Sequence, residues 1–543
     1  MKSKKSWAEK LAILAVICAG LILVVLNIVC GNHWLDSDMA AEMIFSKLLA
    51  EEGSLIASTN WYYSTEFRVL YTQLVMVPLH HIMENWHVIR VITNVVFYLL
   101  MLGSFFFAVK PLNIKKKNVW LCSLALFVPV SEAVMTHLQM GNTYMSHVIL
   151  IFMVFGLYLR LCDKEGSRKV LWGALYGVLT VILGLSGVRY LLDLIVPLCI
   201  TAVCLWLSSK EFKAFRKETT LDHLRSLVCS AKTEYVKFSV LGLALAGVGY
   251  VINALFVSKV YQFQTYEATN FIKIQEGVFF DRVQNALGEL LQMFGYIENK
   301  SFLSLRGIVT IVAFVMIAIL AFVWKKCMTY RKSEELAEAA DTVETNRSFT
   351  VLFAGISFVL HLFVFIFTTS TMVDRYFIPI AIFFLISLAI YMEWEKVKFD
   401  RIIVGVALLL CLLLAGTKTY YSFITSDKNE TRYEMADYLV EEGYTFGYAS
   451  YWNSNIMTEL SDGALEMANL WSIDSMGDFK WSSRVSTYYN KEGKVFLIVA
   501  KTELNELESY GMLEKQPVIY ENNDYIVLHF DSQADFQAYR AVN

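Results

Sequence analysis

Long apolar stretches separated by short polar connections run through the chain as far as about residue 421. Each approaches the roughly 20 residues that a helix needs to cross a hydrocarbon core of about 30 Å. The pattern therefore predicts a polytopic α-helical membrane protein with about 11 transmembrane helices. The stretches fall near residues 8–30, 87–109, 119–137, 145–161, 169–186, 190–208, 237–257, 303–324, 349–369, 376–392 and 401–421.

Basic residues predict which side of the membrane each connection faces. Lys2, Lys4, Lys5 and Lys10 precede or open the first stretch, and Lys and Arg cluster in every second connection after it. Because basic loops stay in the cytoplasm, we expect a multi-pass plasma-membrane protein with a cytoplasmic N-terminus. An odd number of crossings then places the residues after 421 outside the cytoplasm.

Two further segments have mixed apolar and polar character. Residues 67–82 are apolar enough to cross, but a crossing there would turn every later basic loop outward. This segment also carries Arg68, Pro78 and two histidines, which suit an interface better than lipid. We therefore predict an interfacial or re-entrant helix there, and another within 270–296, where apolar residues recur at helical spacing among charged ones.

Residues 422–543 differ from the rest of the chain in pattern and in charge. Helical and strand patterns follow one another in short runs, which predicts a small α/β domain. We thus expect a transmembrane domain over 1–421, with a first outer loop at 31–86, and an extracytoplasmic domain over 422–543. With 20 acidic and 9 basic residues, the second domain is not expected to bind nucleic acid. Its expected helices are 431–442 and 502–510, and its expected strands are 446–450, 495–500, 518–520 and 525–530.

Two aspartates directly follow the first apolar stretch. Asp36 and Asp38 lie in the run Gly-Asn-His-Trp-Leu-Asp-Ser-Asp, at the outer membrane surface in the predicted topology. A helix that begins there would place Glu42 on the same side as Asp38. The two aspartates are either the start of a solvated loop or a site that exchanges a proton or holds a divalent cation.

Other polar residues gather at the outer ends of the predicted helices. Arg189 and Arg375 are either interfacial anchors or partners of Asp193 and Asp374, because charged groups at membrane depth usually face a cavity. The candidate substrate-binding residues are Glu66, Arg68, His137, Asn142, Arg189, Tyr190, Asp374, Arg375 and Tyr376.

Aromatic and histidine residues in the same regions have plainer interpretations. The aromatic run at 61–63 is typical of an interfacial belt, with a platform for a sugar as the alternative. His137 and His147 are expected to cap helices, since two scattered histidines do not define a metal site.

These residues together match what group transfer from a lipid phosphate requires. A carboxylate takes the acceptor's proton or holds a cation, and arginines bind the departing phosphate with their planar fork. The acidic first loop and the run Asp374-Arg375-Tyr376-Phe377-Ile378-Pro379, which resembles a late Arg-Tyr-x-x-Pro pattern, make the chain similar to the GT-C glycosyltransferases. These are polytopic enzymes of the protein O-mannosyltransferase and aminoarabinose transferase type, which use polyprenyl-phosphate-linked sugars.

The resemblance implies an inverting-type glycosyltransferase with a GT-C-like fold. It would move a sugar from a polyprenyl-phosphate donor to a cell-envelope acceptor, a glycan, lipid or protein, on the outer face of the membrane. Asp36 or Asp38 would be the general base or a metal ligand, and Arg189 and Arg375 would bind the donor phosphate, with Arg68 a weaker candidate. The C-terminal domain would orient the acceptor or bind cell-wall polymer.

Two points stay open within this resemblance. Several such families carry adjacent Asp-Glu in the first loop, whereas this chain has Asp36-Ser37-Asp38. Which aspartate is the base, and whether a divalent cation takes part, is therefore not decided.

A lipid-linked sugar transporter or flippase, and a non-catalytic membrane-anchored surface protein, are the alternative functions. A transporter would show related halves with interrupted helices near the bilayer midplane, whereas this sequence shows no such repeat and gathers its charges at one face. A surface protein would not need acidic and basic residues at several outer helix ends.

Overall fold

The computed structural model describes residues 6–141, 143–163, 168–264, 269–273, 276–299, 301, 303–336, 341–508 and 516–541. The described chain forms two compact units. Unit 1 falls within Met1–Leu23, Val96–Asn253 and Glu267–Ser422, and unit 2 within Val24–Val95, Ala254–Tyr266 and Phe423–Asn543. The residues of the predicted first loop therefore belong to the same unit as the C-terminal residues.

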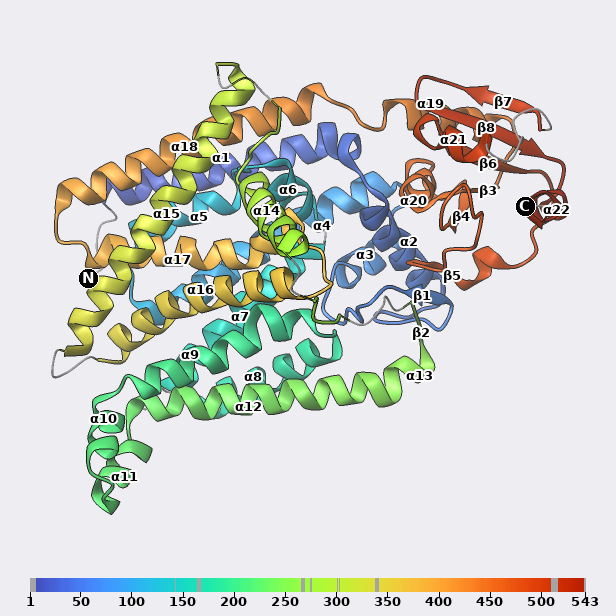
Figure 1. Cartoon of the computed structure of the whole chain (residues 1–543). Coiled ribbons are helices and arrows are strands. Elements are labelled where there is room, and N and C mark those ends of the chain that lie inside the picture. Colours follow the sequence, from blue (N-terminus) through green and yellow to red (C-terminus); the bar gives the residue numbers. More distant parts are fainter. Residues whose placement is uncertain are drawn as a thin grey trace. The chain divides into compact units, whose positions relative to one another are not determined.

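Long apolar helices identify a multi-pass membrane protein. Among the described residues, eight helical segments are long and apolar enough to cross a membrane, and a further pair, Leu191–Leu207 with Lys210–Lys217, is bent by 58°. The predicted count of 11 crossings stays a prediction. The eight segments correspond to α1 (Trp7–Cys30), α4 (Trp86–Val109), α7 (Thr143–Cys162), α12 (Ala231–Ile252), α15 (Leu305–Leu336), α16 (Thr342–Phe367), α17 (Ile378–Trp394) and α18 (Lys398–Thr425) (Figure 1). The bent pair contains α9 (Val196–Leu207), and α8 (Lys169–Leu185) is a shorter apolar helix.

The third predicted stretch, 119–137, is not one continuous helix. It is divided among α5 (Lys116–Ser123), a 3-10 turn at Leu124–Leu126, the short α6 (Glu132–Val134) and a π-helical turn at Met135–Gln139. Pro129 lies between these pieces and has no backbone N–H with which to continue a helix.

The two segments predicted as interfacial or re-entrant contain short helices. α3 (Gln73–His80) has 8 residues, far fewer than a crossing needs. α14 (Glu276–Met293) lies within the second segment.

Close packing of α8 against α12 in unit 1 depends on glycine. A Cβ atom on Gly184 would collide with the backbone of Ala246, and one on Gly249 would collide with the backbone of Val181. Small residues allow helix backbones to approach in lipid, where no hydrophobic force drives helices together. The two helices accordingly run side by side (Figure 1).

Unit 2 contains a five-stranded mixed sheet made from C-terminal residues. β3 (Phe446–Ser450) pairs in parallel with β4 (Glu466–Leu470) and β6 (Val495–Ala500). β8 (Tyr525–Phe530) pairs antiparallel with β6 and with β7 (Val518–Glu521), so the strand order is β4-β3-β6-β8-β7.

Helices complete this α/β region. α19 (Glu430–Glu441) precedes the sheet, α20 (Tyr451–Leu460) connects the parallel strands β3 and β4, and α22 (Gln533–Ala541) follows β8. The predicted strands and the first predicted helix are therefore present, whereas α20 and β4 were not predicted. The second predicted helix is α21 (Leu504–Glu508), and part of its predicted range lies outside the described residues.

A second, three-stranded sheet joins distant segments of unit 2. β1 (Trp61–Tyr63) pairs with β2 (Gln262–Phe263) on one side and β5 (Ser483–Arg484) on the other. Trp61 and Tyr63 are only 4% and 5% exposed and pack in one apolar core. The rings of Trp61 and Tyr63 are therefore neither part of an interfacial aromatic belt nor a platform for a sugar, the two interpretations expected for 61–63.

Candidate functional site

The first aspartate of the pair begins a helix. Asp36 is the N-cap of α2 (Ser37–Glu51), and its Oδ1 accepts a hydrogen bond of 2.8 Å from the backbone N–H of Met39. An N-terminal carboxylate satisfies an otherwise unpaired backbone donor and interacts favourably with the helix dipole. The Asp-Ser-Asp sequence thus fixes Asp36 in position while it places Asp38 in the first turn of α2.

Glu42 lies one turn after Asp38 and is buried among donors. Tyr71 Oη donates a short hydrogen bond to Glu42 Oε1, and Thr72 Oγ1 donates one of 3.1 Å to Oε2. Arg68 Nη1 lies 3.5 Å from Glu42 Oε1, and its Nε donates to Glu66 Oε2 at 3.2 Å. Two predicted substrate-binding residues, Glu66 and Arg68, are therefore part of one charged network with Glu42.

Burial changes the acidity of two of these carboxyl groups. The pKa of Asp36 is raised to about 7, chiefly by desolvation and then by the neighbouring charge of Asp38. Desolvation also raises the pKa of Glu42 to about 7, although the positive charge of Arg68 opposes the shift. Unit 2 therefore holds two carboxyl groups whose pKa is raised by burial.

Helix α20 supplies partners to this part of unit 2. Tyr451 Oη donates a hydrogen bond of 2.5 Å to Asp38 Oδ1. Eight residues further along α20, Glu459 accepts from Arg90 Nε and Nη2 at 2.7 and 2.6 Å. Arg90, on α4, also donates to the backbone carbonyl of Met39 at 2.9 Å, one residue after Asp38. The C-terminal residues thus help to position the aspartate segment.

Unit 1 contains a separate buried cluster of polar groups. His147 Nε2 lies 2.5 Å from Asp193 Oδ2, and His361 Nε2 lies 2.7 Å from Asp193 Oδ1. His361 Nδ1 lies 2.8 Å from the backbone carbonyl of Ser357. The expectation that His147 only caps a helix is therefore wrong, because its ring binds a buried carboxylate on another helix.

Most of the remaining predicted residues gather near this cluster. The Arg189 guanidinium lies 5.2 and 5.9 Å from the ring centroids of Tyr144 and Tyr376, and that of Arg375 also lies 5.9 Å from the Tyr376 ring. The Tyr190 ring stacks on His147 at 4.1 Å. The two arginines therefore share an aromatic neighbour.

His137, Asp374 and Asn142 complete the set of predicted residues. The His137 ring contacts the Tyr144 ring edge-on at 6.0 Å, and Asp374 Oδ1 accepts from the Arg375 backbone N–H at 2.7 Å. Asn142 lies outside the described residues. Unit 1 thus brings together five of the predicted residues: His137, Arg189, Tyr190, Arg375 and Tyr376.

Sequence reasoning missed several residues of these networks, among them His361, Arg90, Tyr451 and Glu459. His361 and Arg90 each interrupt an apolar helix, and an ionisable group within an apolar stretch is a recognised signal of a buried polar site. Tyr451 and Glu459 lie in α20, whose sequence carries no distinguishing motif, so no comparable signal exists for them.

The same carboxylates offer few free oxygens to a metal ion. Within the part of the chain that the structure describes, no three His, Cys, Asp or Glu side chains form a group suited to a metal ion. Both oxygens of Glu42 and one oxygen of Asp38 already accept hydrogen bonds from side chains. Asp36 and Asp38 are therefore the residues that a divalent cation would have to use.

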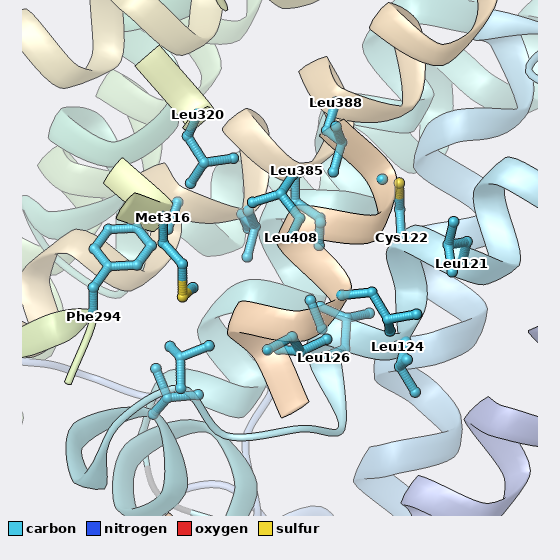
Figure 2. Close-up of a pocket in the computed structure, with 18 of the residues that line it drawn as sticks. Leu121, Cys122, Leu124, Leu126, Phe294, Met316, Leu320, Leu385, Leu388 and Leu408 are labelled. Atoms are coloured by element: carbon cyan, nitrogen blue, oxygen red, sulfur yellow. The ribbon is translucent and has the colours of Figure 1, made fainter. Parts of the chain in front are cut away.

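An apolar cavity of about 140 Å³ lies among α5, α14, α15, α17 and α18 of unit 1. Figure 2 shows leucine side chains gathered around it, together with Cys122, Phe294 and Met316. Ile378 and Leu385 of α17 also line it. A second apolar cavity, of about 360 Å³, shares Phe294, Leu320 and Ala381 with the first. Both cavities suit a hydrocarbon chain.

Comparison with known proteins identifies the fold. No protein-family model matches the sequence, and no curated protein matches it significantly. Among solved structures, ArnT from Cupriavidus metallidurans bound to undecaprenyl phosphate superimposes with a TM-score of 0.51 at 12% identity, covering 95% of this chain and 97% of that one. The chain therefore has the fold of ArnT, and the predicted GT-C-like fold is confirmed.

Two other structures also match. ArnT from the same organism in the apo state gives a TM-score of 0.49 at 11% identity, with the same coverage of 95% and 97%. Arabinofuranosyltransferase AftD from Mycobacteria gives 0.36 at 10% identity, covering 89% of this chain and 35% of that one.

Proposed function

We propose that the protein is a glycosyltransferase that moves a sugar from a polyprenyl-phosphate donor to a cell-envelope acceptor on the outer face of the membrane. The observation that carries the proposal is the carboxylate cluster of Asp36, Asp38 and Glu42 in a fold shared with a protein that binds undecaprenyl phosphate. A carboxyl group whose pKa lies near 7 is well matched to general base catalysis at neutral pH.

Asp36 is the favoured base in this proposal. Its carboxylate takes the proton from an acceptor hydroxyl while the hydroxyl oxygen forms a bond to the anomeric carbon of the donor sugar. The bond between that carbon and the phosphate oxygen breaks, and polyprenyl phosphate leaves with the electron pair. A single displacement of this kind inverts the configuration at the anomeric carbon.

Unit 1 has the groups that the donor requires. Arg189 and Arg375 carry planar guanidinium groups that match phosphate oxygens. Arg375 lies three residues before Ile378, which begins α17 and lines the apolar cavity of Figure 2. A phosphate held at Arg375 would therefore have an apolar path along α17 for its lipid tail.

Binding of a divalent cation is the second role that we propose for the two aspartates. Such an ion, bound to Asp36 and Asp38, would supply positive charge to neutralise a departing phosphate. Asp36 and Asp38 carry only two carboxylates, so such an ion would keep several waters, as Mg²⁺ does.

The test is transfer of radiolabelled sugar from a panel of polyprenyl-phosphate sugars by the purified full-length protein. Asp36→Asn, Asp38→Asn and the double variant are compared with Asp437→Asn, which removes an exposed carboxylate of α19 in the same unit. We expect transfer by the wild type and by Asp437→Asn, with loss of about 100-fold or more in the double variant.

Each other outcome has a definite meaning. Transfer that survives the double substitution would contradict the assignment of the aspartates. Loss of wild-type activity in EDTA, restored by a divalent cation, would assign Asp36 and Asp38 as metal ligands. Absence of transfer from every donor, with lipid-linked sugar bound equally by wild type and double variant, would favour a transporter.

A further inference from the structure

Aromatic side chains surround Tyr451 in unit 2. The Tyr451 ring contacts those of Trp452 and Phe479, with centroids 5.2 and 5.6 Å away. Phe479 in turn contacts Trp471 at 4.3 Å and stacks against Trp481 at 5.7 Å. These five residues form one continuous group, called here the aromatic cluster.

Two indole rings of the aromatic cluster are exposed. Trp452 and Trp471 are 57% and 58% exposed, whereas Tyr451, Phe479 and Trp481 are buried beneath them. Burial of an indole is strongly favourable, so exposure of two in one cluster is not explained by folding. Each exposed indole contacts a buried ring, Trp452 that of Tyr451 and Trp471 that of Phe479.

The residues that border the aromatic cluster are polar. Between Trp471 and Trp481, the apolar side chains Ile473 and Met476 point into the protein core. Of the polar residues in this segment, Asp474, Asp478 and Lys480 are exposed and Ser472 is half-buried. Asp478 Oδ1 accepts a hydrogen bond of 2.6 Å from Arg540 Nη1, and Lys480 Nζ lies 5.6 Å from the Tyr62 ring centroid. The surface therefore alternates aromatic faces with hydrogen-bonding groups.

This alternation indicates a carbohydrate. The faces of a pyranose carry C–H groups that rest on the electron-rich face of an indole, while its hydroxyls require donors and acceptors at the rim. The central part of a protein–protein interface, in contrast, is depleted in charged residues. An anionic membrane surface would be repelled by residues 422–543, which contain 20 acidic and 9 basic residues.

The position of the aromatic cluster connects it to the candidate catalytic site. Tyr451 belongs to the cluster through its ring and donates a hydrogen bond to Asp38 through its hydroxyl. A sugar resting on Trp452 or Trp471 thus lies one or two ring contacts from the residue that holds Asp38.

We propose that Trp452 and Trp471 form a subsite for a carbohydrate acceptor that leads to Asp38. The proposal rests on the proposed glycosyltransferase function and specifies the acceptor as a glycan, since lipid and protein acceptors do not need paired exposed indoles with a polar rim.

The experiment measures glycan binding directly, without requiring transfer. The full-length protein in nanodiscs is titrated calorimetrically with chitotetraose, cellotetraose and maltotetraose, and Trp452→Ala, Trp471→Ala and the double variant are compared with the wild type. We expect binding of at least one tetrasaccharide, weakened about 3- to 10-fold in each single variant and further in the double variant. Tyr489→Ala, which removes a side chain 61% exposed outside the aromatic cluster, should bind as the wild type does.

Contrary results would overturn the subsite. The first is that none of the three sugars binds, and the second is that the double variant binds as well as the wild type. The third is that brominated lipids quench the fluorescence of the wild type more than that of the double variant, because this would place the indoles in the bilayer. If glycan binding depends on both tryptophans but no donor sugar is transferred, the subsite stands and the glycosyltransferase function falls. If transfer occurs with a glycan KM unchanged in the double variant, the function stands and the subsite falls.

Discussion

Tyr451 donates a hydrogen bond of 2.5 Å to Asp38, although 413 positions separate the two residues in the sequence. One of the two carboxylates predicted to do chemistry is thus held by a residue of a tail helix. The hydroxyl fixes the position of the Asp38 side chain, and hydrogen bonds to charged groups contribute about 1.5–3 kcal/mol.

We therefore expect Tyr451→Phe to lower kcat for sugar transfer by about 10-fold with little change in donor KM. The substitution keeps the ring contacts with Trp452 and Phe479 and removes only the hydroxyl. Tyr438→Phe is the control, because it deletes a hydroxyl that binds a backbone carbonyl of Ile519 in the same unit. Equal kinetics for Tyr451→Phe and wild type would show that Asp38 does not depend on this contact.

Removing one partner of the buried pair Arg90 and Glu459 is expected to destabilise unit 2. Arg90 is 1% exposed and Glu459 4% exposed, so removing either partner leaves an uncompensated buried charge and costs about 3–5 kcal/mol. Arg90→Met and Glu459→Met should each lower the thermal unfolding temperature in detergent, and the double variant should recover part of the loss.

Arg484→Met provides the comparison for that pair. Arg484 and Glu51 form an ion pair of 2.7 Å in which Glu51 is largely exposed, and such pairs contribute about 0–1 kcal/mol. The unfolding temperature of the Arg484→Met variant should stay near the wild-type value. If the double variant loses more stability than the two single variants lose together, the pairing of Arg90 with Glu459 is contradicted.

Sugar transfer should depend on pH through Asp36. Its pKa is raised to about 7 by burial first and by Asp38 second, and only the deprotonated form accepts a proton. We expect kcat/KM to fall as the pH drops through about 7. Asp38→Asn removes the neighbouring charge that raises the Asp36 pKa, so the acidic limb of any remaining activity should move to lower pH. Glu42→Gln should move the limb in the same direction by a smaller amount. An acidic limb at the same pH in both variants would contradict Asp36 as the base.

Thermal stability should also change with pH, in the direction set by Glu42. Its folded pKa of about 7 lies above the ordinary value of 4.5, so between these values the folded state binds more protons than the unfolded state. Stability should therefore fall as the pH rises from about 5 to about 7 and level off above that. Glu42→Gln should flatten this slope in melting curves, and an unchanged slope would place the titration elsewhere.

The arginines of unit 1 should act on the donor. Arg189→Ala and Arg375→Ala are expected to raise the donor KM about 10- to 100-fold, and the corresponding lysine variants less, since lysine keeps the charge but lacks the planar fork. Arg225→Ala, on the exposed face of α11 (Leu221–Val228), is the control. Weaker inhibition of these variants by undecaprenyl phosphate would confirm that the phosphate is what they bind, and unaltered inhibition would exclude it.

Local patterns in the sequence predicted the elements well and their long-range contacts poorly. The apolar period predicted a first helix at 8–30, and α1 spans Trp7–Cys30. A helix beginning at the aspartates was the condition for placing Glu42 on the same side as Asp38, and α2 does begin there, at Ser37. Neither the pairing of Glu459 with Arg90 nor that of His361 with Asp193 has a local signature, because 369 and 168 positions separate the partners.

Two other predictions failed because they relied on local composition. The stretch at 119–137 has the hydropathy of a crossing, yet its backbone changes conformation around Pro129. The rings of Trp61 and Tyr63 suit an interface by residue type, but tertiary packing buries them in a strand. In both places, local composition was overridden by packing that only the whole chain provides.

The connectivity of unit 2 has a consequence for biosynthesis. Arg90 leaves the ribosome 369 residues before Glu459 does, so a growing chain carries an arginine whose buried partner has not been made. Tyr451 reaches Asp38 only after most of the polypeptide has been translated. The aspartate segment is thus completed late, and a prematurely terminated product would lack the partners of both Arg90 and Asp38.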